Sequence, residues 1–137
     1  MIKRLLPLAL VSLLLAAGMA RADDADLGKL EFKNSCAACH GMDGKGGTEM
    51  GEFLRIQPPD LSQLQKNNGG VFPTARVYNT IDGRQAVKAH GPRAMPVWGQ
   101  RYTDDAALVY ADPLLGERTV RVRILALIDY LYQLQRP

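Results

Sequence analysis

Apolar side chains recur at helical spacing near both ends of the chain, and the region between them has no regular pattern. Residues 117–135 form the strongest predicted helix, because charged residues fall largely outside one continuous apolar stripe. That stripe consists of Val120, Ile124, Leu127, Ile128, Leu131 and Leu134. A second helix is predicted over residues 26–35, where Gly28, Phe32 and Cys36 follow one another at four-residue spacing on one face.

The middle of the chain is rich in turn-forming residues. Most of the 13 Gly and 8 Pro lie between residues 41 and 102. One short helix is predicted after residues 58–60, another between Pro73 and Gly83, and a third from Thr103 onward. No segment alternates like a strand, so we predict an all-α domain with short helices and long loops. Such loops bury little apolar area by themselves, which a large enclosed apolar ligand would remedy.

The first 22 residues have the pattern of a cleaved secretory leader. Two cations near the start precede an apolar run over residues 5–17, and small residues follow as far as Ala22. The apolar run is shorter than the ~20 residues that span a bilayer. We therefore predict a signal peptide over residues 1–22 and a single domain over residues 23–137, exported to the periplasm without stable membrane insertion.

The charge balance changes once this leader is set aside. The chain carries 17 Lys and Arg against 14 Asp and Glu, which gives a formal charge of +3. Lys3, Arg4 and Arg21 account for the whole excess, so the exported domain is formally neutral. A neutral domain lacks the basic surface typical of nucleic-acid binding, and we expect no nucleic-acid partner.

One motif carries specific chemistry, Cys36-Ala37-Ala38-Cys39-His40. In a C-x-x-C-H sequence both thiols can add to the vinyl groups of haem, and the adjacent imidazole can reach the iron from the same side. We therefore predict one covalently attached haem c, bound through Cys36 and Cys39 with His40 as an iron ligand. A secretory leader agrees with this prediction, because c-type haem is attached outside the bacterial cytoplasm.

Three other interpretations of the motif are weaker. A thioredoxin-like C-x-x-C expects a βαβ pattern, which the sequence lacks. A structural zinc site needs four ligands, and Cys36, Cys39, His40 and His90 are the only Cys and His in the chain. A disulfide between the two cysteines would close too short a loop to stabilise the domain much.

The second axial ligand of the iron has four candidates, and we favour Met95. Met42 follows His40 too closely to reach the opposite face of a haem, and Met50 lies only ten residues beyond that histidine. Met95 instead stands between two prolines that stiffen the segment carrying its sulfur. A thioether ligand favours ferrous iron and raises the reduction potential. His90 is the next candidate, and a methionine that only fills the core is the remaining interpretation.

At this point the chain resembles the class I c-type cytochromes, monohaem proteins with histidine and methionine ligands, over essentially all of residues 23–137. Gly28 and Phe32 precede the first haem cysteine at the family's spacing, and Leu127 and Tyr130 resemble its C-terminal helix. The resemblance implies a small cytochrome c fold in which the N- and C-terminal helices cross at these four residues, with short helices and long loops around the haem.

The family likeness also implies residues that support the haem and its ligands. A proline carbonyl that orients the proximal imidazole would come from Pro58 or Pro59, and the likeness does not decide between them. Arg93 and Trp98 flank the presumed methionine ligand and are candidate haem-pocket residues, with a solvated arginine and a core indole as the other interpretation. Arg84 and Tyr78 are further candidates. Residues 106–115 resemble an addition without an assigned function.

These features predict an electron carrier without substrate chemistry of its own. It would act as a monomer that exchanges single electrons with a redox protein donor and acceptor through transient complexes. One alternative is a haem subunit held permanently in a dehydrogenase or oxidase complex, for which the apolar residues of 106–115 would serve docking. A peroxidase or gas-binding protein ranks last, because it needs an open iron position and distal acid/base groups.

Overall fold

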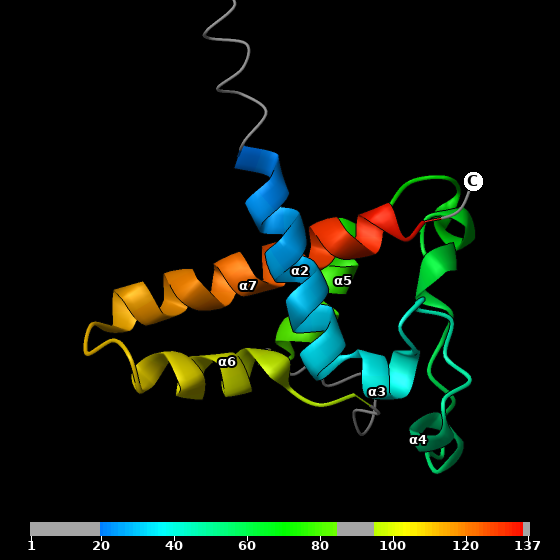
Figure 1. Ribbon diagram of the computed structural model, residues 1–137, viewed down its shortest axis with the longest axis horizontal. Helices are drawn as coiled ribbons and strands as arrows, with labels where there is room; N and C mark the ends of the chain where they lie inside the picture. Colours follow the sequence, from blue (N-terminus) through cyan, green and yellow to red (C-terminus); the bar gives the residue numbers. More distant parts are fainter. Residues whose placement is uncertain (1–19, 85–94, 136–137) are drawn as a thin grey trace, which may run out of the picture.

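The computed structural model describes residues 20–84 and 95–135. Regular structure in these two ranges is entirely helical, which confirms the predicted all-α fold (Figure 1). The α-helices are α2 (Ala20–Ser35), α3 (Ala37–His40), α4 (Glu49–Glu52), α5 (Thr74–Asp82), α6 (Trp98–Ala107) and α7 (Pro113–Gln133), with two 3-10 turns at Leu61–Gln63 and Lys66–Asn68. None of these helices is both long enough and apolar enough to cross a bilayer.

Helices α2 and α7 cross at the residues that the sequence predicts (Figure 1). A Cβ on Gly28 would collide with the carbonyl of Ala126 and would lie 2.9 Å from the Cβ of Tyr130. The rings of Phe32 and Tyr130 pack with their centroids 5.2 Å apart, and Leu127 is buried beside them. The small residue therefore allows two helix backbones to approach closely, and the aromatic pair fills the space next to that contact.

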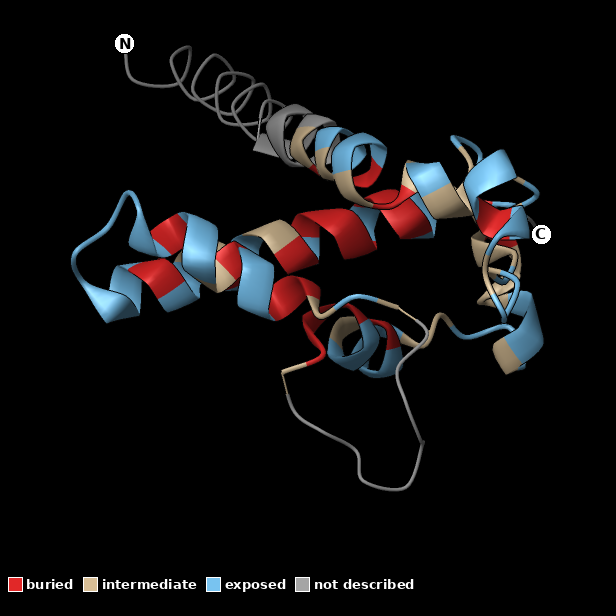
Figure 2. Ribbon diagram, turned by 90° about the horizontal axis from the view of Figure 1, so that it is seen from below, coloured by how far each residue is buried: buried red, intermediate tan, exposed pale blue. Residues whose placement is uncertain are grey.

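The core lies on the faces of α2, α5, α6 and α7 that point toward one another (Figure 2). Five members of the predicted α7 stripe are buried and Leu134 is partly buried against them. Val77 and Ile81 bring α5 into this core, and Gly83 ends that helix in the left-handed conformation at φ 62°. The helix predicted between Pro73 and Gly83 is thus confirmed.

Three predicted helix boundaries are wrong at their starts. Helix α6 begins at Trp98 and not at Thr103. The hydroxyl of Thr103 does not cap the helix; it lies inside it and donates to the carbonyl of Gly99 at 2.8 Å. Helix α7 begins at Pro113, where the carboxylate of Asp112 accepts the amide of Leu114 at 2.9 Å. Helix α2 begins at Ala20, within the expected leader. Residues 106–115 accordingly form the end of α6, a turn and the start of α7.

The single helix predicted after residues 58–60 is replaced by two 3-10 turns. The backbone amide of Leu61 donates to Gly44 at 2.7 Å, and the carbonyl of Leu61 accepts from the side chain of Gln135 at 2.8 Å. Because distant residues satisfy these backbone groups, the segment does not need helical hydrogen bonds of its own. The turn thereby connects the loop after α3 to the end of the chain that the structure describes.

Candidate functional site

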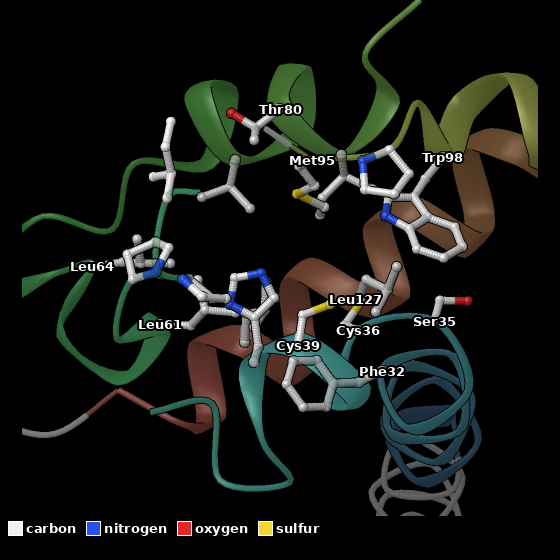
Figure 3. Close-up of a pocket in the computed structure, with 18 of the residues that line it drawn as sticks. Phe32, Ser35, Cys36, Cys39, Leu61, Leu64, Thr80, Met95, Trp98 and Leu127 are labelled. Atoms are coloured by element: carbon white, nitrogen blue, oxygen red, sulfur yellow. The ribbon is translucent and has the colours of Figure 1, made fainter. Parts of the chain in front are cut away.

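A cavity of about 350 Å³ lies between α2, α3, α5 and α7, closed on one side by the residues that lead into α6 (Figure 3). Its lining is mostly apolar, and Phe32, Leu61, Leu64, Val77, Ile81 and Leu127 contribute to it. The predicted residues Cys36, Cys39, His40, Pro58, Pro59, Met95 and Trp98 all line this same cavity. The fold thus brings together site residues that are spread over about 60 positions of the sequence.

The break between α2 and α3 presents the motif to the cavity. The amide of Cys36 donates to the carbonyl of Phe32 at 2.9 Å, and the amide of His40 donates to the carbonyl of Cys36 at 2.9 Å. Cys36 is buried and Cys39 half-buried, and both thiols are free. Burial, with smaller contributions from Glu31 and Cys39, raises the pKa of the Cys36 thiol to about 12. A protonated, buried thiol is unlike the acidic thiols of disulfide oxidoreductases.

The surroundings of His40 favour a neutral imidazole. Burial lowers its pKa, and the carbonyl of Pro59 beside the ring opposes part of that shift. Its Nδ1 is nevertheless buried without a hydrogen bond of ordinary geometry in the described part of the chain. The carbonyl oxygen of Pro58 instead lies next to Gly46, where a Cβ on that glycine would be 2.9 Å from it. Of the two candidate prolines, the geometry therefore favours Pro59 as the partner of the imidazole.

Met95 lies on the other side of the cavity from Cys39, and its sulfur points into the cavity (Figure 3). The side chain is half-buried and packs against the hydrophobic core. Met42 and Met50 are 54% and 53% exposed and do not line the cavity. His90, the other candidate ligand, lies outside the described residues.

The remaining pocket candidates separate into different groups. Trp98 is buried and lines the cavity, with the guanidinium of Arg101 5.3 Å from the centroid of its ring. Arg84 and Tyr78 are not cavity residues: Arg84 forms ion pairs elsewhere, and Tyr78 packs partly buried against the core. Arg93 lies outside the described residues.

An ion-pair cluster that the sequence does not predict lies behind the site. The guanidinium of Arg123 on α7 bonds to Glu31 at 2.8 Å and 3.1 Å and to Asp105 at 3.1 Å. It also lies 3.9 Å from the ring centroid of Tyr102, a fully buried residue of α6. No local sequence pattern predicts this cluster, because its members come from three separate helices.

The donor set fits a haem better than a bare metal ion. Two free thiols and a half-buried imidazole line an apolar cavity, and a thioether approaches from the other side. Within residues 20–84 and 95–135, no group of three or more His, Cys, Asp or Glu side chains is placed to hold a metal ion. An apolar cavity with two thiols beside a histidine is the arrangement that covalent haem attachment requires.

Comparison with known proteins supports this interpretation. The family described as "Cytochrome C oxidase, cbb3-type, subunit III" matches residues 23–109, which is more than half of the chain. A cbb3-type cytochrome c oxidase subunit, FixPc of Rhizobium leguminosarum bv. viciae, is 38% identical over 80 residues. That alignment covers 58% of this chain and 23% of the relative, so the chain spans less than a quarter of that protein. No solved structure matches.

The family match and the site geometry agree on the cofactor. Proteins of this kind bind haem c covalently, and the two thiols, the imidazole and the apolar cavity are the features that such a haem needs. The match ends before α7, yet α7 supplies the partner of Gly28 at the predicted helix crossing. The chain belongs to the cbb3-type cytochrome c oxidase subunit III family and is a class I monohaem c-type cytochrome, an electron-transfer haem protein.

Proposed function

We propose that this chain is a periplasmic electron carrier whose haem iron is held by His40 and Met95. One observation carries the proposal: the Cys36–His40 motif and the Met95 sulfur approach the same apolar cavity from different sides. Two protein ligands would fill both axial positions and leave none for a substrate. Bound there, haem c supplies reversible Fe(II)/Fe(III) exchange, the one redox reaction that a carrier needs.

The chain's own residues hold and tune that centre. Cys36 and Cys39 form the thioether bonds, and the Pro59 carbonyl orients the imidazole of His40 and strengthens it as a donor. The Met95 thioether favours the ferrous state and raises the reduction potential. The apolar lining excludes water, so little solvent has to reorganise when the charge on the iron changes.

Export and partner choice complete the proposal. The leader over residues 1–22 directs the domain to the periplasm, where it works as a monomer between a redox protein donor and acceptor. Ala38, which lies between the two haem cysteines, is exposed and marks the surface where a partner would approach. A transient interface of small area suits such an exchange. A formally neutral domain predicts weak overall steering, so local patches orient the partners.

The absorption spectrum of the purified ferric protein tests this function. The protein is expressed with the haem-attachment machinery, and its intact mass shows whether one haem is bound. We expect the weak far-red band that reports sulfur bonded to iron. Haem without this band would contradict methionine ligation and favour His90 or an open position, which is the peroxidase or gas-binding alternative. Protein without haem would contradict the whole assignment.

A second function is favoured by a separate observation at the turn between α6 and α7. Five large hydrophobic side chains there are exposed, from 39% to 88%: Leu108, Val109, Tyr110, Leu114 and Leu115. The Rhizobium relative is named as an oxidase subunit. The chain would then be a haem subunit held in such a complex, with this turn in the interface. Elution of protein from its native host only as a monomer on gel filtration would contradict that alternative.

A further inference from the structure

Arg84 sits at the centre of an ion-pair cluster that joins the end of α5 to α7. Its Nε bonds to the carboxylate of Asp82 at 2.6 Å, and its two terminal nitrogens bond to the carboxylate oxygens of Glu117 at 2.7 Å and 2.9 Å. The Asp82 side chain is 11% exposed and that of Arg84 25%, whereas that of Glu117 is 54% exposed. The bidentate pair fixes the guanidinium plane as well as its charge.

The same cluster contacts the start of α6. A Cβ on Gly99 would collide with the carboxylate of Asp82 and would lie 2.9 Å from Nε of Arg84. Thr103, one turn further along α6, lies 3.3 Å from Arg84 and is bonded in turn to the carbonyl of Gly99. The end of α5 and the start of α6 are therefore held together around one guanidinium.

These contacts bear on Met95 because of where they fall in the sequence. Arg84 is the last residue before positions 85–94, and Gly99 follows Met95 by four residues. The cluster thus holds the start of α6, four residues beyond Met95, against the end of α5 and against α7. Fixing the backbone next to Met95 reduces the entropy that this side chain loses when its sulfur binds.

We propose that Arg84, held by Asp82 and Glu117, is a positioning residue that keeps the Met95 sulfur at the haem iron. This role rests on the proposed axial ligation by Met95. Arg84 does not line the cavity; it acts by holding the start of α6, four residues beyond Met95, against α5 and α7. The absence of a side chain at Gly99 is part of the arrangement, because it leaves room for the Asp82 carboxylate.

The experiment measures how easily an added ligand displaces the methionine. Arg84→Gln holoprotein is titrated with imidazole in the ferric state, and the far-red sulfur band is followed alongside the reduction potential. We expect imidazole to bind about tenfold more tightly, which corresponds to about 1.4 kcal/mol, together with a partly bleached band and a lower potential. Glu117→Gln, which leaves the buried Asp82 paired, should fold normally and shift each quantity less in the same direction.

Arg123→Gln provides the matched control. Arg123 also pairs one guanidinium with two carboxylates and also joins α6 to α7, but its bonds go to Glu31 and Asp105 and not to α5 or Gly99. It should lose stability with the band and imidazole affinity unchanged. Equal imidazole affinity in wild type, Arg84→Gln and Glu117→Gln, or an equal rise in Arg123→Gln, would overturn the positioning role. A band that survives in Met95→Ala would instead overturn the ligand assignment on which it rests.

Discussion

The two sides of the cavity are built from the chain in different ways. The side with Cys36, Cys39 and His40 comes from five consecutive residues, and backbone hydrogen bonds within that stretch set the turn that carries them. The Met95 side depends on residues far apart in sequence, since Arg84 and Glu117 are 33 positions apart. One side is therefore a local motif attached to α2, and the other is assembled by tertiary contacts.

This difference shows where each side is vulnerable. The motif side keeps its shape as long as α2 stays seated on α7, because the turn into α3 needs no distant partner. The Met95 side needs several packed elements at once, including α5, α6 and α7. A substitution at the helix crossing should affect the whole domain, whereas a substitution on the Met95 side should change the iron environment with a smaller loss of stability.

The largest expected effect comes from Gly28→Val at the helix crossing. The new side chain would collide with the Ala126 carbonyl, and overpacking a tight contact of this kind costs about 3 kcal/mol of unfolding free energy. Haem incorporation should fall with it, because α2 carries the motif. Lys29→Val is the control, since Lys29 is exposed on the same helix. Denaturant unfolding of both holoproteins is the measurement, and equal midpoints would contradict the crossing's role.

Met95→Ala should alter the Met95 side of the cavity and leave the side with the cysteine motif intact. Haem stays covalently bound through Cys36 and Cys39, but the far-red band disappears, the reduction potential falls and the ferrous iron gains carbon monoxide binding. Removing this half-buried side chain should also cost about 2 kcal/mol of unfolding free energy, near the low end for methionine truncation. Met42→Ala is the control, because Met42 is 54% exposed. Carbon monoxide binding that is equal in both variants would contradict the assignment.

Arg123→Gln should weaken the packing behind the cavity without altering the iron. It removes bonds to Glu31 and Asp105 from a guanidinium that also covers the ring of Tyr102. Because the Glu31 side chain is only 12% exposed, we expect a loss of about 1 kcal/mol in unfolding free energy. Thermal unfolding measures the loss, and an altered visible spectrum would show that this cluster also reaches the haem.

The smallest expected effect is the loss of the stabilising contribution of Glu117 at acidic pH. Hydrogen bonds from Arg84 hold the pKa of Glu117 below its ordinary value of 4.5. A lowered carboxylate pKa contributes stability above that ordinary value, and the contribution is lost as the pH falls below it. Glu117 is exposed, so the difference between wild type and Glu117→Gln should stay below about 1 kcal/mol. Denaturant unfolding of both proteins at pH 7 and pH 3.5 measures this difference in unfolding free energy. A difference that is larger at pH 3.5 than at pH 7 would contradict the pairing.

Much of the fold follows from patterns within short stretches of sequence. The stripe of α7, the spacing of Gly28, Phe32 and Cys36, and the stop of α5 at Gly83 were all predictable from local rules. The start of α6 was not, because Thr103 and the acids after it imitate a helix start, whereas the Thr103 hydroxyl donates to the Gly99 carbonyl inside the helix. The turn at Leu61 was missed because its hydrogen bonds go to Gly44 and Gln135.

The sequence by itself determined the haem motif, because that depends on residue types at fixed short spacings, and its resemblance to a family implied the helix crossing and the class of protein. Only the tertiary structure decided that the Pro59 carbonyl faces His40 while that of Pro58 faces Gly46, since neighbouring carbonyls differ only in direction. The tertiary structure also showed that Arg84, a candidate for the haem pocket, forms an ion pair with Glu117. The choice of partner for a long charged side chain depends on which distant carboxylates the folded helices bring within reach.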